Sequence, residues 1–235
     1  MLKIFRLLRK RLFVGVRGWS KNILVTPRVN TYVDNFLLKS ETSEMKAYLS
    51  ETQKMFSAGM QSPLGEARFI ALLVKAVKDK RVLELGTFRG FTAAQIASVL
   101  PSDGELITCE FRHEHAEYSN KWFSRLGLNK KIKVLEGRGG AILDVLIKEG
   151  QKFDVIFVDA NKSDYKAYFD QALRLINPGG LILADNTLWA SLVTYEKSED
   201  KMAEWMKEFN EHVFKCVGQG AVILPVWDGL TIIVV

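Results

Sequence analysis

Two apolar runs of strand length end in side chains that can hold a hard cation. One run begins at Phe153 and ends at Asp159, and another begins at Gly180 and ends at Asp185, which Asn186 follows. Carboxylate and amide oxygens suit Mg2+, which usually keeps further positions open for water or substrate. An acid after a strand can instead cap a helix, and this is the alternative for each residue taken alone. If the runs are parallel strands, Asp159, Asp185 and Asn186 converge at one sheet edge, which favours a divalent-cation site.

A turn with two glycines, Gly86 and Gly90, follows an earlier run and leads directly into a helical stretch. In a doubly wound sheet, such a turn lets the backbone approach a cofactor closely. Glu110 ends the next run, roughly 20 residues further on, where a carboxylate can accept hydrogen bonds from ribose hydroxyls. A glycine needed for a tight bend and a solvated acid are the alternatives. Turn and acid together predict nucleoside binding, but they do not separate a nicotinamide cofactor from S-adenosylmethionine.

The chain that carries these motifs alternates between short apolar runs and longer amphipathic segments. The alternation predicts a doubly wound, Rossmann-like α/β fold with a mostly parallel seven-stranded sheet and helices on both faces. The last two runs are too close for a crossover, so we expect a hairpin and an antiparallel edge strand. Two N-terminal helices are expected at 40–58 and 65–78. The expected strands are 81–85, 106–110, 133–135, 153–159, 180–185, 221–225 and 231–235, and the helices between them are 91–99, 113–126, 140–149, 164–176 and 198–214.

Charge is distributed unevenly along the 235 residues. The formal net charge is +6, but residues 1–33 hold eight Lys or Arg and no acid, which leaves 25 basic against 27 acidic side chains in the rest. A nearly neutral body gives no general electrostatic reason for nucleic-acid binding. The apolar runs are too short to span a bilayer, and the two cysteines lack the spacing of a disulfide framework or a zinc site. We expect a single domain at 34–235 in a reducing, cytoplasmic setting.

Residues 1–33 are interpreted as a separate basic leader or targeting segment. Phe5, Leu8 and Leu12 share one helical stripe, and basic residues lie on another. This pattern fits peripheral membrane contact through residues 1–14, a mitochondrial transit peptide, or a leader that is loose or packed on the body. The sequence does not choose among these alternatives.

Residues from about 40 to 235 resemble the cation-dependent O-methyltransferase family that includes the caffeoyl-CoA and catechol O-methyltransferases. The matching stretches are MQSP at 60–63, VLELGTFRGFTA at 82–93, the acid of LITCE at 106–110, FDVIFVDANKSDY at 153–165, NPGGLILADNTLW at 177–189 and PVWDGLTIIV at 225–234. They follow the family's order at nearly the family's spacing. The resemblance implies S-adenosylmethionine-dependent, metal-assisted methylation of a hydroxyl on a small catechol-like or vicinal-diol substrate. Mg2+ is the expected cation, and a homodimer is the expected assembly.

The resemblance also implies roles for individual residues. Asp159, Asp185 and Asn186 match the metal ligands, and Lys162 matches the catalytic lysine, with an ordinary solvated lysine as its alternative. In this mechanism the metal fixes the substrate hydroxyl and lowers its pKa, and Lys162 accepts the proton. The residues implied to contact the cofactor are Ser62, Glu84, Gly86, Thr87, Thr92, Glu110 at the ribose, Gly139 near the adenine, Asp159 and Asn161.

Some positions depart from the family pattern and leave the acceptor open. Asn161 stands where a second Asp is usual, Arg89 where small or apolar residues are common, and Ala190 where His or Asn is typical. Several aromatic side chains are candidates either for a wall around a flat substrate or for the core. They are Trp189, Trp227, Tyr165 and Tyr168.

Two other functions share parts of the pattern. A nicotinamide-dependent oxidoreductase shares the fold and the ribose acid, but the degenerate glycine turn and the lack of a recognisable Tyr/Lys or His/Asp arrangement disfavour it. A non-catalytic, membrane-attached methyltransferase-like protein would use the basic N-terminus. The intact metal set and Lys162 disfavour that second alternative.

Overall fold

The structure is a computed structural model that describes residues 27–55, 58–77 and 80–235, and it divides into two compact units, Met1–Lys39 and Ser40–Val235. In the smaller unit the described part is helix α2 (Pro27–Ser40), which ends one residue beyond the unit. The proposed domain boundary after residue 33 falls inside this helix and stays a prediction. Segment 1–14, with its membrane and mitochondrial alternatives, lies outside the described residues.

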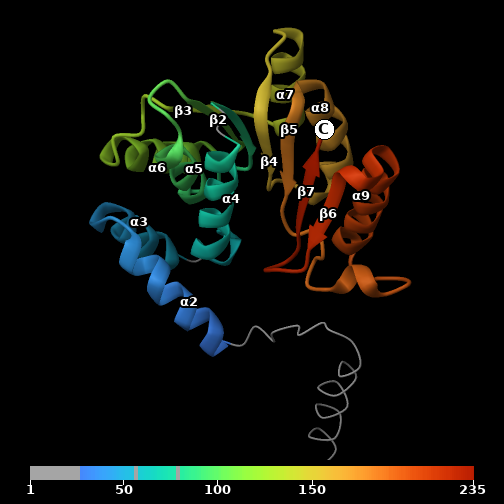
Figure 1. Ribbon diagram of the computed structural model, residues 1–235, viewed down its shortest axis with the longest axis horizontal. Coiled ribbons are helices and arrows are strands. Elements are labelled where there is room, and N and C mark those ends of the chain that lie inside the picture. The colour runs from blue at the N-terminus through green and yellow to red at the C-terminus, as the bar shows by residue number, and fades with distance from the viewer. Residues whose placement is uncertain (1–26, 56–57, 78–79) are drawn as a thin grey trace, which may run out of the picture. The chain divides into compact units, whose positions relative to one another are not determined.

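The larger unit is built on a seven-stranded sheet in the order β3-β2-β1-β4-β5-β7-β6 (Figure 1). Strands β1 to β5 pair in parallel, whereas β7 is antiparallel to both β5 and β6. This arrangement confirms the doubly wound, mostly parallel sheet and its hairpin, with β6 lying outside the antiparallel β7. The strands are β1 (Arg81–Leu85), β2 (Glu105–Glu110), β3 (Ile132–Glu136), β4 (Phe153–Val158), β5 (Ile176–Ala184), β6 (Ala221–Leu224) and β7 (Leu230–Val234).

Helices cover both faces of the sheet. Figure 1 shows α4 and α5, which pack together, on one side, and α7, α8 and α9 on the other. The helix expected at 40–58 is shorter, because Thr42 caps a new helix there by accepting a hydrogen bond from the backbone N–H of Met45 at 3.2 Å. The helices are α3 (Ser43–Gln53), α4 (Leu64–Ala76), α5 (Phe91–Val99), α6 (His113–Arg125), α7 (Gly139–Lys148), α8 (Tyr165–Leu175) and α9 (Lys201–Val217). None of the helices within the described ranges combines the length and apolar character that crossing a membrane requires.

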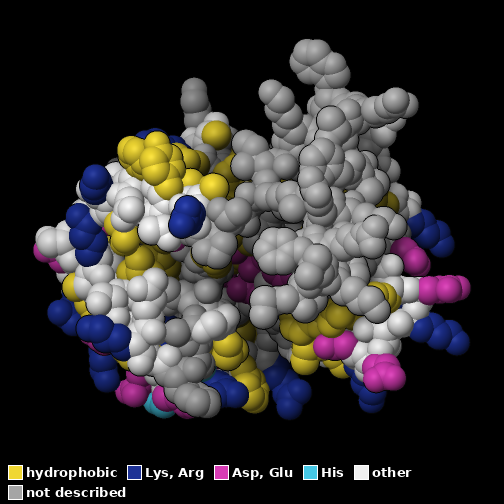
Figure 2. Space-filling model, turned by 90° about the horizontal axis from the view of Figure 1, so that it is seen from below, with side chains coloured by type: hydrophobic (Ala, Val, Ile, Leu, Met, Phe, Trp, Pro, Cys, Tyr) yellow, Lys and Arg dark blue, Asp and Glu magenta, His cyan; other side chains and the backbone are white. Residues whose placement is uncertain are grey.

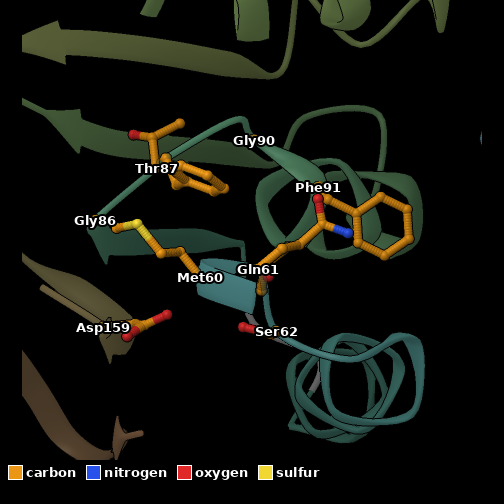
Figure 3. Close-up of a pocket in the computed structure, with 10 residues that line it drawn as sticks. Met60, Gln61, Ser62, Gly86, Thr87, Gly90, Phe91 and Asp159 are labelled. Atoms are coloured by element: carbon orange, nitrogen blue, oxygen red, sulfur yellow. The ribbon is translucent and has the colours of Figure 1, made fainter. Parts of the chain in front are cut away.

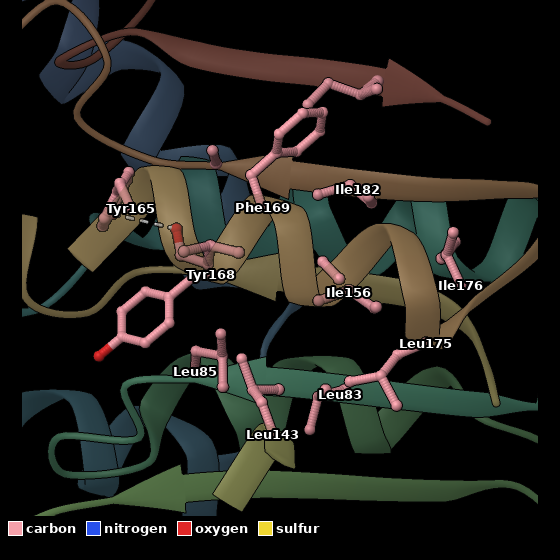
Figure 4. Close-up of a cluster of buried hydrophobic side chains, with 14 of the residues drawn as sticks. Leu83, Leu85, Leu143, Ile156, Tyr165, Tyr168, Phe169, Leu175, Ile176 and Ile182 are labelled. Carbon is pink, nitrogen blue, oxygen red and sulfur yellow. Dashed lines mark hydrogen bonds between the residues drawn. The ribbon is translucent and has the colours of Figure 1, made fainter. Parts of the chain in front are cut away.

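The main core lies between the sheet and helices α7 to α9 (Figure 4). Leu83 and Leu85 of β1, Ile156 of β4 and Phe169 of α8 belong to this one buried cluster. A strand buried on both faces reads as a continuous apolar run, which explains the sequence pattern. The close packing holds the carboxyl ends of β1, β4 and β5 in place, and the residues that follow these ends form the candidate site.

Two of the four candidate wall aromatics are core residues. Tyr165 and Tyr168 both belong to the cluster on α8, and Tyr165 is fully buried. Burial among side chains of the sheet and α9 removes Tyr165 from any surface that a substrate could touch. Figure 4 shows the hydroxyl of Tyr168 directed away from the cluster.

Candidate active site

The glycine turn brings the ends of β1 and β4 into direct contact. Gly86 has a φ of +100°, and a Cβ built on it would lie 1.8 Å from the backbone oxygen of Asp159. The backbone N–H of Asp159 in turn donates to the carbonyl of Leu85 at 2.8 Å. A side chain at position 86 would therefore need both an unfavourable backbone conformation and displacement of the neighbouring strand end.

A pocket lies between this turn and the segment that precedes α4 (Figure 3). The side chains of Ser62 and Asp159 point toward each other across it, with Met60 close by. Helix α5 begins directly after the turn, so its free N–H groups lie at the same end of the sheet. The pocket is lined by Met60, Gln61, Ser62, Gly86, Thr87, Phe88, Gly90, Phe91, Thr92 and Asp159.

A buried polar network supports the turn from below. Thr108 of β2 donates from its hydroxyl to Glu84 of β1, and its Oγ1 lies 2.6 Å from Oγ1 of Thr87. Burial, together with the nearby Asp159 and Glu110, raises the pKa of Glu84 to about 8, although the hydrogen bond from Thr108 lowers it. Glu84 thus lies beneath the turn and is not a pocket-lining residue.

The other predicted cofactor residues, Glu110, Gly139 and Asn161, are not among the residues that line this pocket. Glu110 is buried, and its two oxygens accept the backbone N–H groups of Phe88 and Arg112 at 2.7 and 2.8 Å. These bonds fix the carboxylate and leave further lone pairs on each oxygen. Gly139 begins α7, where an added Cβ would lie 3.1 Å from the hydroxyl of Tyr168. Asn161 is exposed, and its amide donates to Ser163 and Asp164, so its side chain is turned onto its own loop.

The candidate metal ligands gather at the carboxyl ends of β4 and β5. Asp185 is buried, and burial followed by the neighbouring Asp159 raises its pKa, whereas Lys162 lowers it. Asn186 follows with a left-handed φ of 59°, a conformation that Asn tolerates better than most residues. In Figure 1, β7 points upward, and β5 and the strands parallel to it run the opposite way, so their carboxyl ends lie at the bottom. Figure 2 views the molecule from below and shows acidic side chains near the middle of that face.

Lys162 reaches into this group from the short helical turn Lys162–Asp164. Its Nζ lies 3.0 Å from Oδ1 of Asp159 and 2.6 Å from the hydroxyl of Tyr165. The same hydroxyl lies 3.1 Å from the carbonyl oxygen of Asp185 and 3.2 Å from that of Val158. Lys162 is buried, so the ordinary solvated lysine does not describe it.

The segment after β5 is held by the β6–β7 hairpin and α9. Thr187 donates from its backbone N–H and from its hydroxyl to the carbonyl of Gly229, at 2.9 and 3.0 Å. Asn210 of α9 donates to the carbonyl of Thr187 at 2.8 Å. These three bonds fix the chain immediately after the two candidate ligands Asp185 and Asn186.

A family model described as O-methyltransferase matches residues 38–234. The chain belongs to this O-methyltransferase family. It is 34% identical over 213 residues to a catechol O-methyltransferase of Niastella koreensis, and the match covers 86% of this chain and 96% of that relative. It is 30% identical over 225 residues to a caffeoyl-CoA O-methyltransferase of Populus kitakamiensis, with 91% and 95% covered.

Solved structures agree with this assignment. The O-methyltransferase TomG of Streptomyces achromogenes, solved in complex with SAM, matches with a TM-score of 0.78 and 26% identity, covering 88% of this chain and 96% of that one. The protein is thus an O-methyltransferase with a Rossmann-like fold, and these matches give no support to a nicotinamide-dependent oxidoreductase.

Sequence reasoning placed several residues of this O-methyltransferase site together but missed two. Ser62, Gly86, Thr87, Thr92 and Asp159 share the pocket, while the roles assigned to them stay predictions. Glu66 of α4 was missed, although it is buried and its carboxyl group is hydrogen-bonded to Asp185. The second, Tyr165, was considered as a wall residue, whereas its hydroxyl joins Lys162 to the strand ends.

Proposed function

We propose that this O-methyltransferase transfers the methyl group of S-adenosylmethionine to a hydroxyl of a small catechol-like or vicinal-diol substrate, with a divalent cation, Mg2+, bound beside it. The observation that carries the proposal is the cluster of Lys162 with Asp159 and Asp185, next to the pocket at the glycine turn. A homodimer remains a prediction that accompanies this proposal.

The residues at the strand ends fit a hard divalent cation. Asp159 and Asp185 supply carboxylate oxygens, and Asn186 supplies an amide oxygen. The carboxyl groups here repel one another: Asp159, which is partly exposed, raises the pKa of the buried Asp185, and Asp185 raises that of the buried Glu66 beyond the effect of burial. A site with this excess of acid favours a cation, which when bound lowers the pKa of a coordinated hydroxyl and orients it.

The glycine turn fits the cofactor. Gly86, which has no side chain, lets the turn lie close against the end of β4, and Ser62 and Thr92 add hydroxyl groups to the pocket that the turn lines. Glu110, held by two backbone N–H groups, lies at the end of β2, where its remaining lone pairs suit the ribose hydroxyls. S-adenosylmethionine supplies an electrophilic methyl group when it is bound.

In this mechanism the protein holds the acceptor hydroxyl, removes its proton and excludes water. Lys162, in its amine form, accepts the hydroxyl proton at Nζ, and Tyr165 together with Asp159 holds Nζ in place. Orienting the acceptor oxygen toward the pocket at the turn removes much of the entropic cost of the transfer. Trp227 of the hairpin is 45% exposed, its ring centroid lies 5.8 Å from that of Phe69, and its aromatic surface suits a flat acceptor.

Methyl transfer from labelled S-adenosylmethionine to a panel of catechols and vicinal diols, with and without chelator, tests the proposal. We expect activity with at least one catechol, its loss in excess EDTA and its recovery with Mg2+. Asp159→Ala is expected to abolish both the activity and its dependence on the cation. Full activity in excess EDTA would refute the cation assignment, and calorimetric binding of NADH but not of S-adenosylhomocysteine would refute the cofactor.

A further inference from the structure

The hydroxyl of Tyr48 links α3 to the glycine turn. It donates a hydrogen bond to the backbone carbonyl of Arg89. The next two residues, Gly90 and Phe91, begin α5 and line the pocket (Figure 3). Tyr48 therefore reaches the part of the turn that passes directly into the pocket wall.

This carbonyl belongs to the peptide group that joins Arg89 to Gly90. Gly90 has a φ of +80°, a conformation that glycine adopts readily but does not adopt exclusively. Because a peptide group is planar, a hydrogen bond to its oxygen restrains the whole group and with it the direction in which the chain enters α5. The bond from Tyr48 therefore acts at the most adaptable residue of this half of the turn.

The side chain that donates the bond is itself held firmly. Tyr48 is fully buried, and its ring stacks on that of Trp122 of α6, with ring centroids 4.5 Å apart and planes 12° from parallel. Its ring also makes a T-shaped contact with that of Phe91, at 5.7 Å between centroids. These contacts give the hydroxyl a fixed position against the turn.

A second hydroxyl close to the turn is engaged elsewhere. Oγ of Ser119 lies 3.3 Å from the carbonyl oxygen of Phe88 but only 2.8 Å from that of His115 in its own helix. A serine hydroxyl has one proton to donate, and the shorter contact has the better geometry for it. Ser119 therefore serves its own helix, whereas the Tyr48 hydroxyl serves the turn.

We infer that Tyr48 is a positioning residue that fixes the Arg89–Gly90 peptide group and so preorganises the turn for S-adenosylmethionine. The inference rests on the proposed function, because it presumes that the cofactor lies against Gly90 and Phe91. A preorganised site loses less conformational freedom when its ligand binds. Loss of the bond should therefore weaken cofactor binding rather than slow the methyl transfer.

Calorimetric titration of the full chain with S-adenosylhomocysteine tests this role without any methyl transfer. The test compares wild type with Tyr48→Phe and with Tyr48→4-aminophenylalanine, which restores a donor at the end of the ring. Thr52→Val is the matched control, because Thr52 is also buried on α3 but its hydroxyl donates to the carbonyls of Tyr48 and Leu49 within the same helix. Thermal melting checks that each variant is folded, and Tyr48→His replaces Tyr48→Phe if the latter does not fold.

We expect Tyr48→Phe to weaken S-adenosylhomocysteine binding about 3- to 10-fold, which corresponds to the net contribution of one hydrogen bond. Thr52→Val and Tyr48→4-aminophenylalanine should bind like wild type. In steady-state kinetics of Tyr48→Phe, KM for S-adenosylmethionine should rise while kcat changes little.

Equal affinity of wild type and Tyr48→Phe would overturn the inference. So would equal weakening by Thr52→Val, because loss of any buried hydroxyl from α3 would then be the cause. A Tyr48→4-aminophenylalanine variant as weak as Tyr48→Phe would overturn it as well, since the restored donor would then have no effect. If the wild type binds no S-adenosylhomocysteine, the proposed cofactor itself fails.

Discussion

The backbone oxygen of Asp159 lies 1.8 Å from the point that a Cβ on Gly86 would occupy. The turn after β1 and the end of β4 that carries Asp159 are therefore in van der Waals contact through main-chain atoms. This contact places the glycine turn of the proposed cofactor pocket directly against the strand end that carries Asp159, a proposed cation ligand. A substitution in the glycine turn is therefore expected to shift the end of β4, and a substitution at the end of β4 is expected to shift the turn.

Gly86→Ala should disrupt this contact. The new methyl group meets main-chain atoms that cannot rotate away, and φ of +100° adds strain of about 1–3 kcal/mol. We expect a marked loss of thermal stability and of S-adenosylhomocysteine binding by calorimetry. Gly150→Ala is the control: φ is +68° and no atom lies within 4 Å of its Cβ position, so it should lose about 1–2 kcal/mol at most and bind normally. Equal behaviour of the two variants would contradict the proposed contact.

Lys162→Met should lower turnover with little effect on cofactor binding. The thioether keeps the length of the side chain but cannot accept a proton, and loss of a general base typically costs 10²- to 10⁴-fold in rate. Steady-state kinetics with a catechol substrate measure kcat, and titration with S-adenosylhomocysteine measures binding. An unchanged kcat would remove Lys162 from the mechanism.

Tyr165→Phe and Tyr168→Phe should differ, although both remove a hydroxyl from α8. The Tyr165 hydroxyl is buried between Lys162 and two strand-end carbonyls, so its loss leaves buried groups without a partner and should cost about 1–3 kcal/mol. The Tyr168 hydroxyl has a bond of 3.3 Å to Asp164, and its loss should cost less. Urea unfolding gives the stabilities, and kcat should fall for Tyr165→Phe alone. Indistinguishable variants would show that the Tyr165 bridge is unimportant.

Glu84→Gln should flatten the dependence of stability on pH. Burial raises the pKa of Glu84 from 4.5 to about 8 in the folded chain, so the unfolded chain releases its proton first as pH rises. Between these values the folded state binds more protons, and stability falls with rising pH by at most about 1.4 kcal/mol per unit for this group. Urea unfolding at several pH values from 5 to about 8 should show a steeper decline for wild type than for Glu84→Gln. Parallel curves would indicate that Glu84 titrates normally.

The sheet could be predicted from sequence because its central strands are buried on both faces. The apolar runs therefore coincide with strands. For example, the run predicted at 81–85 has the same bounds as β1, Arg81–Leu85. The prediction was less accurate for β5, which begins at Ile176 and not at Gly180. Pro178, Gly179 and Gly180 indicate a turn locally, yet Val235 forms backbone hydrogen bonds with both glycines and extends the strand. Such a pairing depends on a distant segment, which a local pattern cannot reveal.

The site was predictable where function places polar residues at strand ends, and less so elsewhere. Asp159, Asp185 and Asn186 stand out because each interrupts or follows an apolar run. Glu66 lies on helix α4 and not at a strand end. The only local indication of its burial is that it stands four residues before Ile70, on the same apolar stripe of the helix. The role of Tyr165 depends on where α8 meets the ends of β4 and β5, so an aromatic residue in the sequence could not indicate it.

The double hydrogen bond from Thr187 to Gly229 has a consequence for how the protein is made. The chain that carries Asp185 and Asn186 leaves the ribosome well before residues 229–234, which fasten it through Gly229 and β7. Until that hairpin has emerged, the stretch after β5 lacks its anchor. A nascent chain therefore carries Asp185 and Asn186, the proposed cation ligands, before the segment that anchors them has emerged.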